Sequence, residues 1–197
     1  MSDSYIAVID EAASHADAVR LAPVVVACLA AEGLIVPTLS SDCVLGGTGY
    51  PAGPRCVEHY DASARGGKGG GNRFWELATC GVEVHAEPWV NVLGFAQVEG
   101  ASCPRCEDQL GDEFVDIAGG LVDAFLEDWR PPRITCAACG KESSLHEWRI
   151  KPLLGFVHFA VVWWNWPPFG DARWRIDLPG LLQRHTGRSF AMTSGRL

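Results

Sequence analysis

Apolar residues in the first forty positions follow two different spacings. Tyr5 to Ile9 alternates and is rich in β-branched side chains, which is typical of a strand. From Ala16 to Glu32 the apolar residues recur three and four positions apart, which predicts a helix. Pro23 lies inside this segment and predicts a kink or a late start of the helix. Leu34 to Leu39 then predicts a second strand, so the chain would open on a βαβ-like or split unit.

The next segment, from Ser40 to Asn72, is rich in Gly, Pro and small polar residues, which predicts loops. The stretch RGGKGGGN at 65 to 72 has the glycines and the lysine of a phosphate-binding loop. It lacks the closing Gly-Lys-Ser/Thr and the preceding apolar strand, so we interpret it as a surface loop. Val82 to Glu87 alternates cleanly and Trp89 to Gln97 follows Pro88, so these two segments predict a hairpin.

The second half of the chain contains one further long helical pattern. Apolar residues at helical spacing predict a helix from Asp112 to Asp128, although Gly119 and Gly120 weaken its middle. After Pro131 and Pro132, which would end this helix, the segment Arg133 to Thr135 predicts a short returning strand.

The last sixty residues contain the strongest strand patterns. Leu145 to Ile150 predicts one strand, and Phe156 to Trp164 predicts a central strand because both of its faces are apolar. Pro179 to His185 predicts a short helix and Ser189 to Leu197 an edge strand. We therefore expect an α+β fold, a mixed sheet with packed helices, in which residues 1–197 form a single domain and 100–150 are a zinc-ribbon-like insert.

Two cysteine pairs provide the clearest chemical signal in the chain. Cys103 and Cys106 form one CxxC motif, and Cys136 and Cys139 form another. A two-residue gap lets both sulfur atoms of a pair turn toward one metal ion, so the four thiolates predict a single tetrahedral zinc site. Four sulfur ligands leave no position for water or substrate, which indicates a structural Zn²⁺. Iron remains an alternative because rubredoxin-like sites use the same ligands.

Other metal arrangements stay open at this stage. Replacement of one cysteine ligand by His146 would create a mixed or open site. A second site is conceivable because Cys56 and His59 have knuckle-like spacing. Its full set would be Cys43, Cys56, His59 and Cys80. The simpler interpretation is that these thiols, with Cys28, are small buried hydrophobic groups.

Composition and charge restrict the functional classes. The chain is 48% hydrophobic and 20% charged, as in ordinary globular proteins, and its eight Trp are unusual. The net charge is −8, and one Zn²⁺ on four thiolates would make it about −10, so nucleic acid is an unlikely main partner.

The ends and apolar runs of the chain suggest a location. The N-terminal segment MSDSYIAVIDEAASHADAVR has no signal-peptide core, and no run approaches the roughly 18 apolar residues of a membrane span. In a reducing compartment, eight cysteines indicate metal ligands and buried thiols. We expect a cytoplasmic protein without membrane contact.

Several short motifs resemble those of a family of uncharacterised bacterial proteins. They are CPRC at 103, Asp128-Trp129, CAACGK at 136, Trp148-Arg149, WNWPPF at 164 and the closing SGRL, together with GTGYPAGP at 47. The resemblance implies a shared fold and carries no activity. A sugar-transporter ATPase label sometimes attached to such proteins finds no support, because an intact Walker A motif is missing.

Two further clusters offer functional interpretations beside structural ones. His85 with Glu83 and Glu87 would provide an acid and a base on one strand face, although a solvated face explains them more simply. A Trp cluster could form a stacking platform or a core seam: Trp163, Trp164, Trp166 and Trp174.

These observations favour a non-enzymatic, zinc-stabilised protein-interaction module, of adaptor or inhibitor type, that binds a basic protein partner. The second hypothesis is a nucleic-acid-binding zinc ribbon, with its cations on one face: Lys68, Arg73, Arg133, Lys141, Arg149 and Lys151. The third is an enzyme with a site near His85, His158 and the Trp cluster. No catalytic set stands out, so whether the chain is an enzyme stays undecided, and a non-enzyme is favoured.

Overall fold

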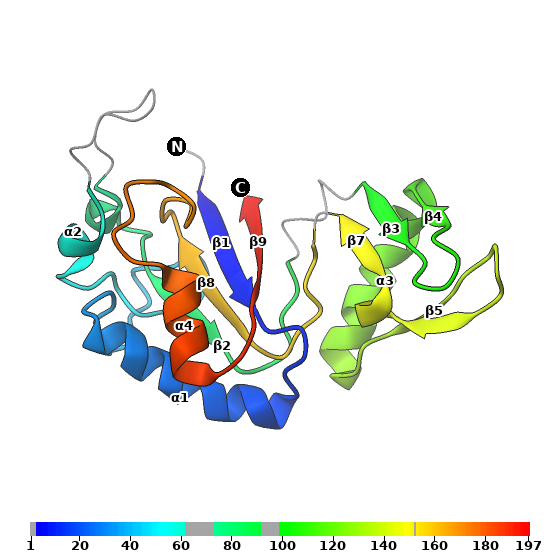
Figure 1. Cartoon of the computed structure of the whole chain (residues 1–197), viewed down its shortest axis with the longest axis horizontal. Coiled ribbons are helices and arrows are strands. Elements are labelled where there is room, and N and C mark those ends of the chain that lie inside the picture. Colours follow the sequence, from blue (N-terminus) through cyan, green and yellow to red (C-terminus); the bar gives the residue numbers. More distant parts are fainter. Residues whose placement is uncertain (1–2, 62–72, 92–98, 152) are drawn as a thin grey trace.

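The computed structural model describes residues 3–61, 73–91, 99–151 and 153–197. The chain divides into a half built on a four-stranded sheet and a half built around α3 and the cysteine pairs, which lie at opposite ends of the long axis (Figure 1). Three predictions fall wholly or partly outside the described residues: the 65–72 loop, most of the predicted 89–97 strand, and Lys68 of the predicted basic face. Within the described ranges, no helix combines the length and apolar character needed to span a membrane.

The main sheet has the strand order β2-β8-β1-β9, and every ladder in it is antiparallel. Its strands are β1 (Ser4–Ile9), β2 (Val82–His85), β8 (Ala160–Trp164) and β9 (Ala191–Arg196). All five residues of β8 are buried, as expected for a central strand that is apolar on both faces. The strand β9 pairs with β1 alone, so it is the predicted edge.

The long helix α1 and the shorter helix α4 cover one face of this sheet. The helix α1 (His15–Ala31) begins with a capping box between Ser14 and Asp17, and it continues through the exposed Pro23. The helix α4 (Leu178–Thr186) has Asp177 as its N-cap and Gly187 in the left-handed conformation as its C-cap. Their buried faces and the sheet share one core, centred on the fully buried Trp163, Phe159 and Leu29.

The cysteine-bearing half has its own core and two small sheets. One sheet has the order β4-β3-β7, and the other pairs β5 with β6. The helix α3 (Asp112–Asp128) packs Phe114, Ala118 and Phe125 into this core. The strands are β3 (Gly100–Ser102), β4 (Gln109–Leu110), β5 (Arg133–Thr135), β6 (Glu142–Ser144) and β7 (Arg149–Lys151).

The α+β class is confirmed, as are the helix over 112–128 and the strand over 133–135. Every ladder between named strands of the described chain is antiparallel, including those of the sheet that was expected to be mixed. The helices near 16–32 and 179–185 are present with boundaries that differ by one residue at each end.

Two local predictions were wrong. Within 34–39 only Ile35 makes an isolated bridge, with Ala52, so the βαβ-like opening is absent; Pro37 removes one backbone donor there. Leu145 to Ile150 is divided into the 3₁₀-helix η3 (Leu145–Glu147) and the start of β7. The strand β2 pairs with β8, and most of the segment predicted to form a hairpin with it lies outside the described residues.

The predicted strand over 156–164 is also shorter than expected. Only Ala160 to Trp164 joins the sheet, because the preceding residues leave it toward the other half of the molecule. Val157 makes an isolated bridge with Trp89, and the Phe156 side chain packs in the core of the cysteine-bearing half. The loop region 40–61 contains one short helix, α2 (Cys56–His59).

Candidate metal centre

The first cysteine pair lies in a tight turn between β3 and β4. The Cys103 N–H donates to the Asp108 carbonyl at 2.9 Å, and the Glu107 N–H donates to the Cys103 carbonyl at 3.0 Å. The Arg105 N–H also points at the Cys103 sulfur, at 3.4 Å. These bonds turn the sulfur atoms of the pair toward the same side.

The second cysteine pair has the same backbone pattern between β5 and β6. The Cys136 N–H donates to the Lys141 carbonyl at 3.0 Å, and the Gly140 N–H donates to the Cys136 carbonyl at 2.8 Å. In both turns the residue after the second cysteine adopts positive φ, 63° at Glu107 and 66° at Gly140. The two turns are therefore geometric equivalents, as expected for zinc knuckles.

The turns bring all four sulfur atoms within 4.8 Å of one another. The Cys103 and Cys139 sulfurs are 3.9 Å apart, and those of Cys106 and Cys136 are 3.7 Å apart. The two sulfur atoms of a disulfide bond lie about 2.0 Å apart, so these pairs are not disulfide-bonded. Four sulfurs at about 2.3 Å from one zinc ion would be separated by about 3.8 Å, so the spacing fits a tetrahedral thiolate site.

Ionisation of this cluster shows why a cation would stabilise it. Burial opposes the Cys103 thiolate, but the N–H groups of Arg105 and Cys106 and the neighbouring thiols lower its pKa to about 7. The Asp108 N–H favours the Cys106 thiolate, yet burial and the other three sulfurs raise the pKa of Cys106 to about 12. Several thiolates can coexist here when a metal cation compensates their repulsion.

The predicted ligands Cys103, Cys106, Cys136 and Cys139 are thus brought together in a set that could bind one metal ion. The cluster joins two hairpins that otherwise have only two or three residues per strand. Because four sulfurs would fill a tetrahedral coordination sphere, the arrangement suits a structural ion better than a catalytic one.

The remaining cysteines form no comparable group. Among the described residues, which include all of the alternative set, only the four-cysteine cluster meets the spacing of a metal site. The Cys56 thiol contacts the Leu34 carbonyl at 3.4 Å, and burial raises its pKa to about 12. Burial is also the largest cause of the raised pKa of Cys28, Cys43 and Cys80. All four are buried thiols.

The histidines considered as site residues lie elsewhere. The His146 ring bonds the Phe156 carbonyl through Nε2, and burial lowers its pKa, so it is held away from the cysteines. His85 Nε2 lies 3.6 Å from a Glu83 carboxylate oxygen, and that oxygen accepts the Trp164 indole N–H at 2.8 Å. This places His85 and Glu83 together, whereas Glu87 lies beyond the end of β2.

The Trp cluster belongs to the core. Trp163, Trp164 and Trp166 are buried, and Trp174 stacks on Trp166 with ring centroids 5.9 Å apart. The nearby Arg173 forms an ion pair with Asp171, in which Nη2 lies 2.6 Å from a carboxylate oxygen. The buried indole rings of Trp163, Trp164 and Trp166 are therefore unavailable as a stacking platform for bases or sugars, and the partly buried Trp174 packs against the same core as Trp163 and Trp166.

A groove between α1 and α4 was not predicted from the sequence. Its lining residues are separated by more than 150 positions, and neither segment carries a recognisable motif. The only available signal was the basic composition of residues 184–188 in an acidic chain. Comparisons with protein-family models, curated proteins and solved structures found no match for this chain.

Proposed function

We propose that this protein is a non-enzymatic interaction module in which a four-thiolate zinc site stabilises α3, and α3 binds a basic amphipathic segment of a protein partner. The observation that carries the proposal is an apolar row on α3 beside a row of carboxylates. Zinc is the proposed metal because it favours tetrahedral thiolate ligation. Eight free thiols suit a reducing location such as the cytoplasm.

The apolar row lies on one flank of α3. With 3.6 residues per turn, Val115, Gly119 and Leu126 fall within about 40° of one another around the helix axis. Val115 is 43% exposed and Leu126 is 42% exposed, which is unusual for two large apolar groups on one flank of a helix. A Cβ placed on Gly119 would meet no atom within 4 Å, so a partner could approach the backbone there.

A row of carboxylates runs beside these residues. Every charged residue of α3 is acidic, and all of them are exposed. Those next to the apolar row fall within about 60° of one another on the helix surface: Asp112, Asp116, Asp123 and Glu127. Together the two rows match an amphipathic helix with apolar residues on one side and lysines or arginines next to them.

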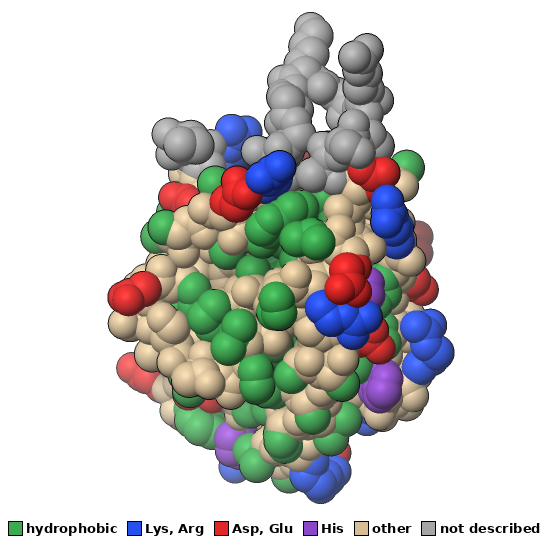
Figure 2. Space-filling model, turned by 90° about the vertical axis from the view of Figure 1, so that its left-hand side faces the viewer, with side chains coloured by type: hydrophobic (Ala, Val, Ile, Leu, Met, Phe, Trp, Pro, Cys, Tyr) green, Lys and Arg blue, Asp and Glu red, His purple; other side chains and the backbone are tan. Residues whose placement is uncertain are grey.

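The described residues at the other end of the molecule do not show this combination. Figure 2 shows that face, where hydrophobic side chains are scattered among polar ones and charged groups of both signs are present. In α2, for example, Val57 is 53% exposed, but its neighbours Arg55 and Glu58 form an ion pair at 2.8 Å. Among the described helices longer than one turn, only α3 combines exposed apolar residues with charge of one sign.

The test uses three designed helical peptides that share one apolar face and carry lysine, glutamate or serine beside it. Binding to the metal-loaded full chain is measured by fluorescence anisotropy at low and moderate salt. We expect the lysine peptide alone to bind, with an affinity that falls as salt rises. Val115→Asp with Leu126→Asp should weaken binding at least about tenfold.

Ile117 provides a matched control on the same helix. It is 43% exposed, as Val115 is, but lies about 160° to 200° around the axis from the apolar row. Ile117→Asp should leave peptide binding unchanged. Equal binding of all three peptides, or an equal loss in Ile117→Asp, would contradict the proposal.

A weaker second candidate is nucleic-acid binding through the outer face of β7. Arg149 and Lys151 line a groove of about 150 Å³ there with Ser102 and Gln109. Carboxylates counter these cations: Glu99 lines the groove, and Glu107 is 3.7 Å from Arg149. A gel-shift assay at low salt decides this candidate, because phosphate binding is strongest there; absence of a shifted band would eliminate it.

A further inference from the structure

A groove of about 330 Å³ lies between the first half of α1 and the C-terminal end of α4, with Arg188 just beyond that end. The α1 wall consists of Asp17, Arg20, Leu21 and Val24. The opposite wall consists of His185, Thr186 and Arg188. This volume is at the lower end of the range for small-molecule sites.

Arg188 is held in place by the buried residue Asp10. Asp10 is 2% exposed, and its carboxylate accepts the Arg188 Nε–H at 2.6 Å. Its other oxygen accepts the Ala12 N–H at 3.0 Å, which fixes the carboxylate. The terminal nitrogen Nη2 of Arg188 is buried and has no hydrogen-bond partner among the described residues. The Nε edge of the guanidinium is therefore fixed, while the Nη2 donor remains unused.

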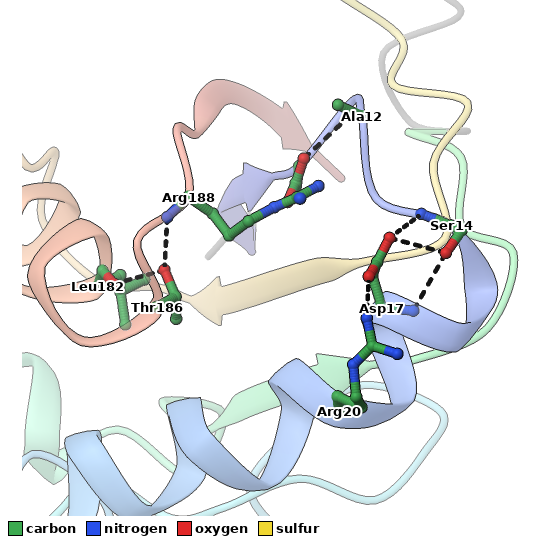
Figure 3. Close-up of polar contacts among 8 residues, drawn as sticks. Ala12, Ser14, Asp17, Arg20, Leu182, Thr186 and Arg188 are labelled. Atoms are coloured by element: carbon green, nitrogen blue, oxygen red, sulfur yellow. Dashed lines mark hydrogen bonds and ion pairs between the residues drawn. The ribbon is translucent and has the colours of Figure 1, made fainter.

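Arg20 is oriented in a similar way from α1. Its guanidinium pairs with the Asp17 carboxylate, while its side chain is 71% exposed. Asp17 also accepts the Ser14 hydroxyl and backbone N–H in the capping box (Figure 3). Hydrogen bonds from Ser14, assisted by the charges of Arg20 and Arg188, lower the pKa of Asp17.

Hydrogen bonds at the end of α4 reduce the negative charge that the helix end would present to an anion. The Thr186 hydroxyl donates to the Leu182 carbonyl at 2.7 Å, and the Gly187 N–H donates to the Gln183 carbonyl at 2.8 Å. Thr186 in turn accepts the Arg188 backbone N–H at 3.2 Å. Carbonyl groups that would otherwise present the negative end of the helix dipole are thus satisfied.

The lining of the groove combines positive charge with an apolar floor. Two guanidinium groups and the His185 imidazole line the groove with the Asp17 carboxylate, and the buried Asp10 carboxylate pairs with Arg188 from behind the lining, in a chain whose net charge is −8. Leu21 and Val24 supply apolar surface between the two walls, and Val24 is 42% exposed. A ligand that matches both features has an anionic group and a small apolar body.

We propose that this groove binds a small organic anion, with its carboxylate or phosphate between Arg20 and Arg188 and its apolar part on Leu21 and Val24. Asp10 is a positioning residue for Arg188 in this site. The site lies in the sheet half, on elements other than α3, so it is independent of the interaction surface proposed above.

The experiment measures binding of four small probes to the metal-loaded full chain by isothermal titration calorimetry. Hexanoate and phenyl phosphate carry the expected chemistry, whereas hexylamine reverses the charge and inorganic phosphate lacks the apolar part. We expect the two organic anions to bind and the other two to bind at least about tenfold more weakly. Equal binding of phosphate, binding of hexylamine, or failure of both organic anions to bind would overturn the proposal.

Variants assign the binding to the groove. Arg20→Gln removes an exposed guanidinium and should weaken hexanoate binding about tenfold or more. Arg184→Gln removes the same charge from the last turn of α4 without touching the groove lining, and it should leave binding unchanged. Val24→Asp should weaken the binding of hexanoate more than the binding of inorganic phosphate. Equal losses in Arg20→Gln and Arg184→Gln would show that general charge, and not this groove, attracts the anion.

Discussion

Glu107 and Gly140 occupy the same position in the two cysteine turns, and their φ angles differ by only a few degrees, 63° and 66°. Each donates its backbone N–H to the carbonyl of the first cysteine of its pair. A left-handed conformation is easy for glycine but costs a residue with a side chain about 1 kcal/mol or more. The first turn therefore contains a residue that its backbone disfavours, whereas the second does not.

This relationship predicts opposite effects of two substitutions. Glu107→Gly should raise the free energy of unfolding by about 1 kcal/mol, because glycine relieves the positive φ. Gly140→Ala should lower it by a similar amount; an added Cβ would meet no atom within 4 Å, so the backbone conformation supplies the whole cost. Denaturant unfolding of the metal-loaded protein measures both. Glu107 also pairs with Arg149, but both side chains are exposed, so little stability is lost there.

The metal centre predicts one ion per chain. Elemental analysis of protein purified without added metal should find about one zinc, and Cys103→Ser with Cys136→Ser should remove it. Loss of the ion should unfold the short hairpins β3–β4 and β5–β6 and expose the core around Phe114 and Phe125. A strong chelator should produce the same loss of structure by circular dichroism.

Cys56→Ser is the control for this experiment, because Cys56 is a buried thiol outside the cluster. It should reduce stability without changing the metal content. Two ions per chain in the wild type would contradict the single-site interpretation, and one iron in place of zinc would direct attention to electron transfer.

Much of this architecture could be predicted from local sequence patterns. The pattern over Asp112 to Asp128 has a strong helical period and two prolines beyond it, and α3 has these boundaries. The CxxC spacing identified four residues whose sulfur atoms meet in the structure. The apolar run before Asn165 identified the central strand, since burial on both faces leaves a continuous apolar signature.

Features that depend on distant pairing could not be predicted in this way. Val82 to His85 alternates like a hairpin strand, but alternation does not reveal that its partner is β8, nearly eighty residues later. Asp10 and Arg188 are 178 positions apart, and nothing in either local sequence indicates their ion pair. The groove between α1 and α4 follows from that long-range arrangement.

Buried histidine predicts that stability falls in mild acid. His158 is 9% exposed, and burial, followed by the neighbouring His15 and His146, lowers its pKa. An unfolded histidine has a pKa of about 6.5, so below this pH the unfolded chain takes up a proton that folded His158 resists. The free energy of unfolding should therefore decrease as pH falls from about 6.5 toward the lower pKa of the folded state. Denaturant unfolding as a function of pH measures the effect.

His158→Leu removes this contribution and should make the decrease shallower. His146, whose pKa is also lowered mainly by burial, should account for part of the decrease that remains. If His158→Leu has the same pH dependence as the wild type, protonation of other groups is responsible and the prediction is wrong.

Two buried tryptophans should respond differently to the same substitution. Trp163 is fully buried, and its indole N–H has no hydrogen-bond partner within the described residues. Trp166 is 3% exposed, and its indole N–H donates to the Cys80 carbonyl at 2.6 Å. Trp→Phe removes similar apolar volume at both positions, but only at Trp166 does it leave a buried carbonyl without its donor. Trp166→Phe should therefore cost about 1 kcal/mol more than Trp163→Phe in denaturant unfolding, and an equal or larger loss at Trp163 would contradict this hydrogen-bond argument.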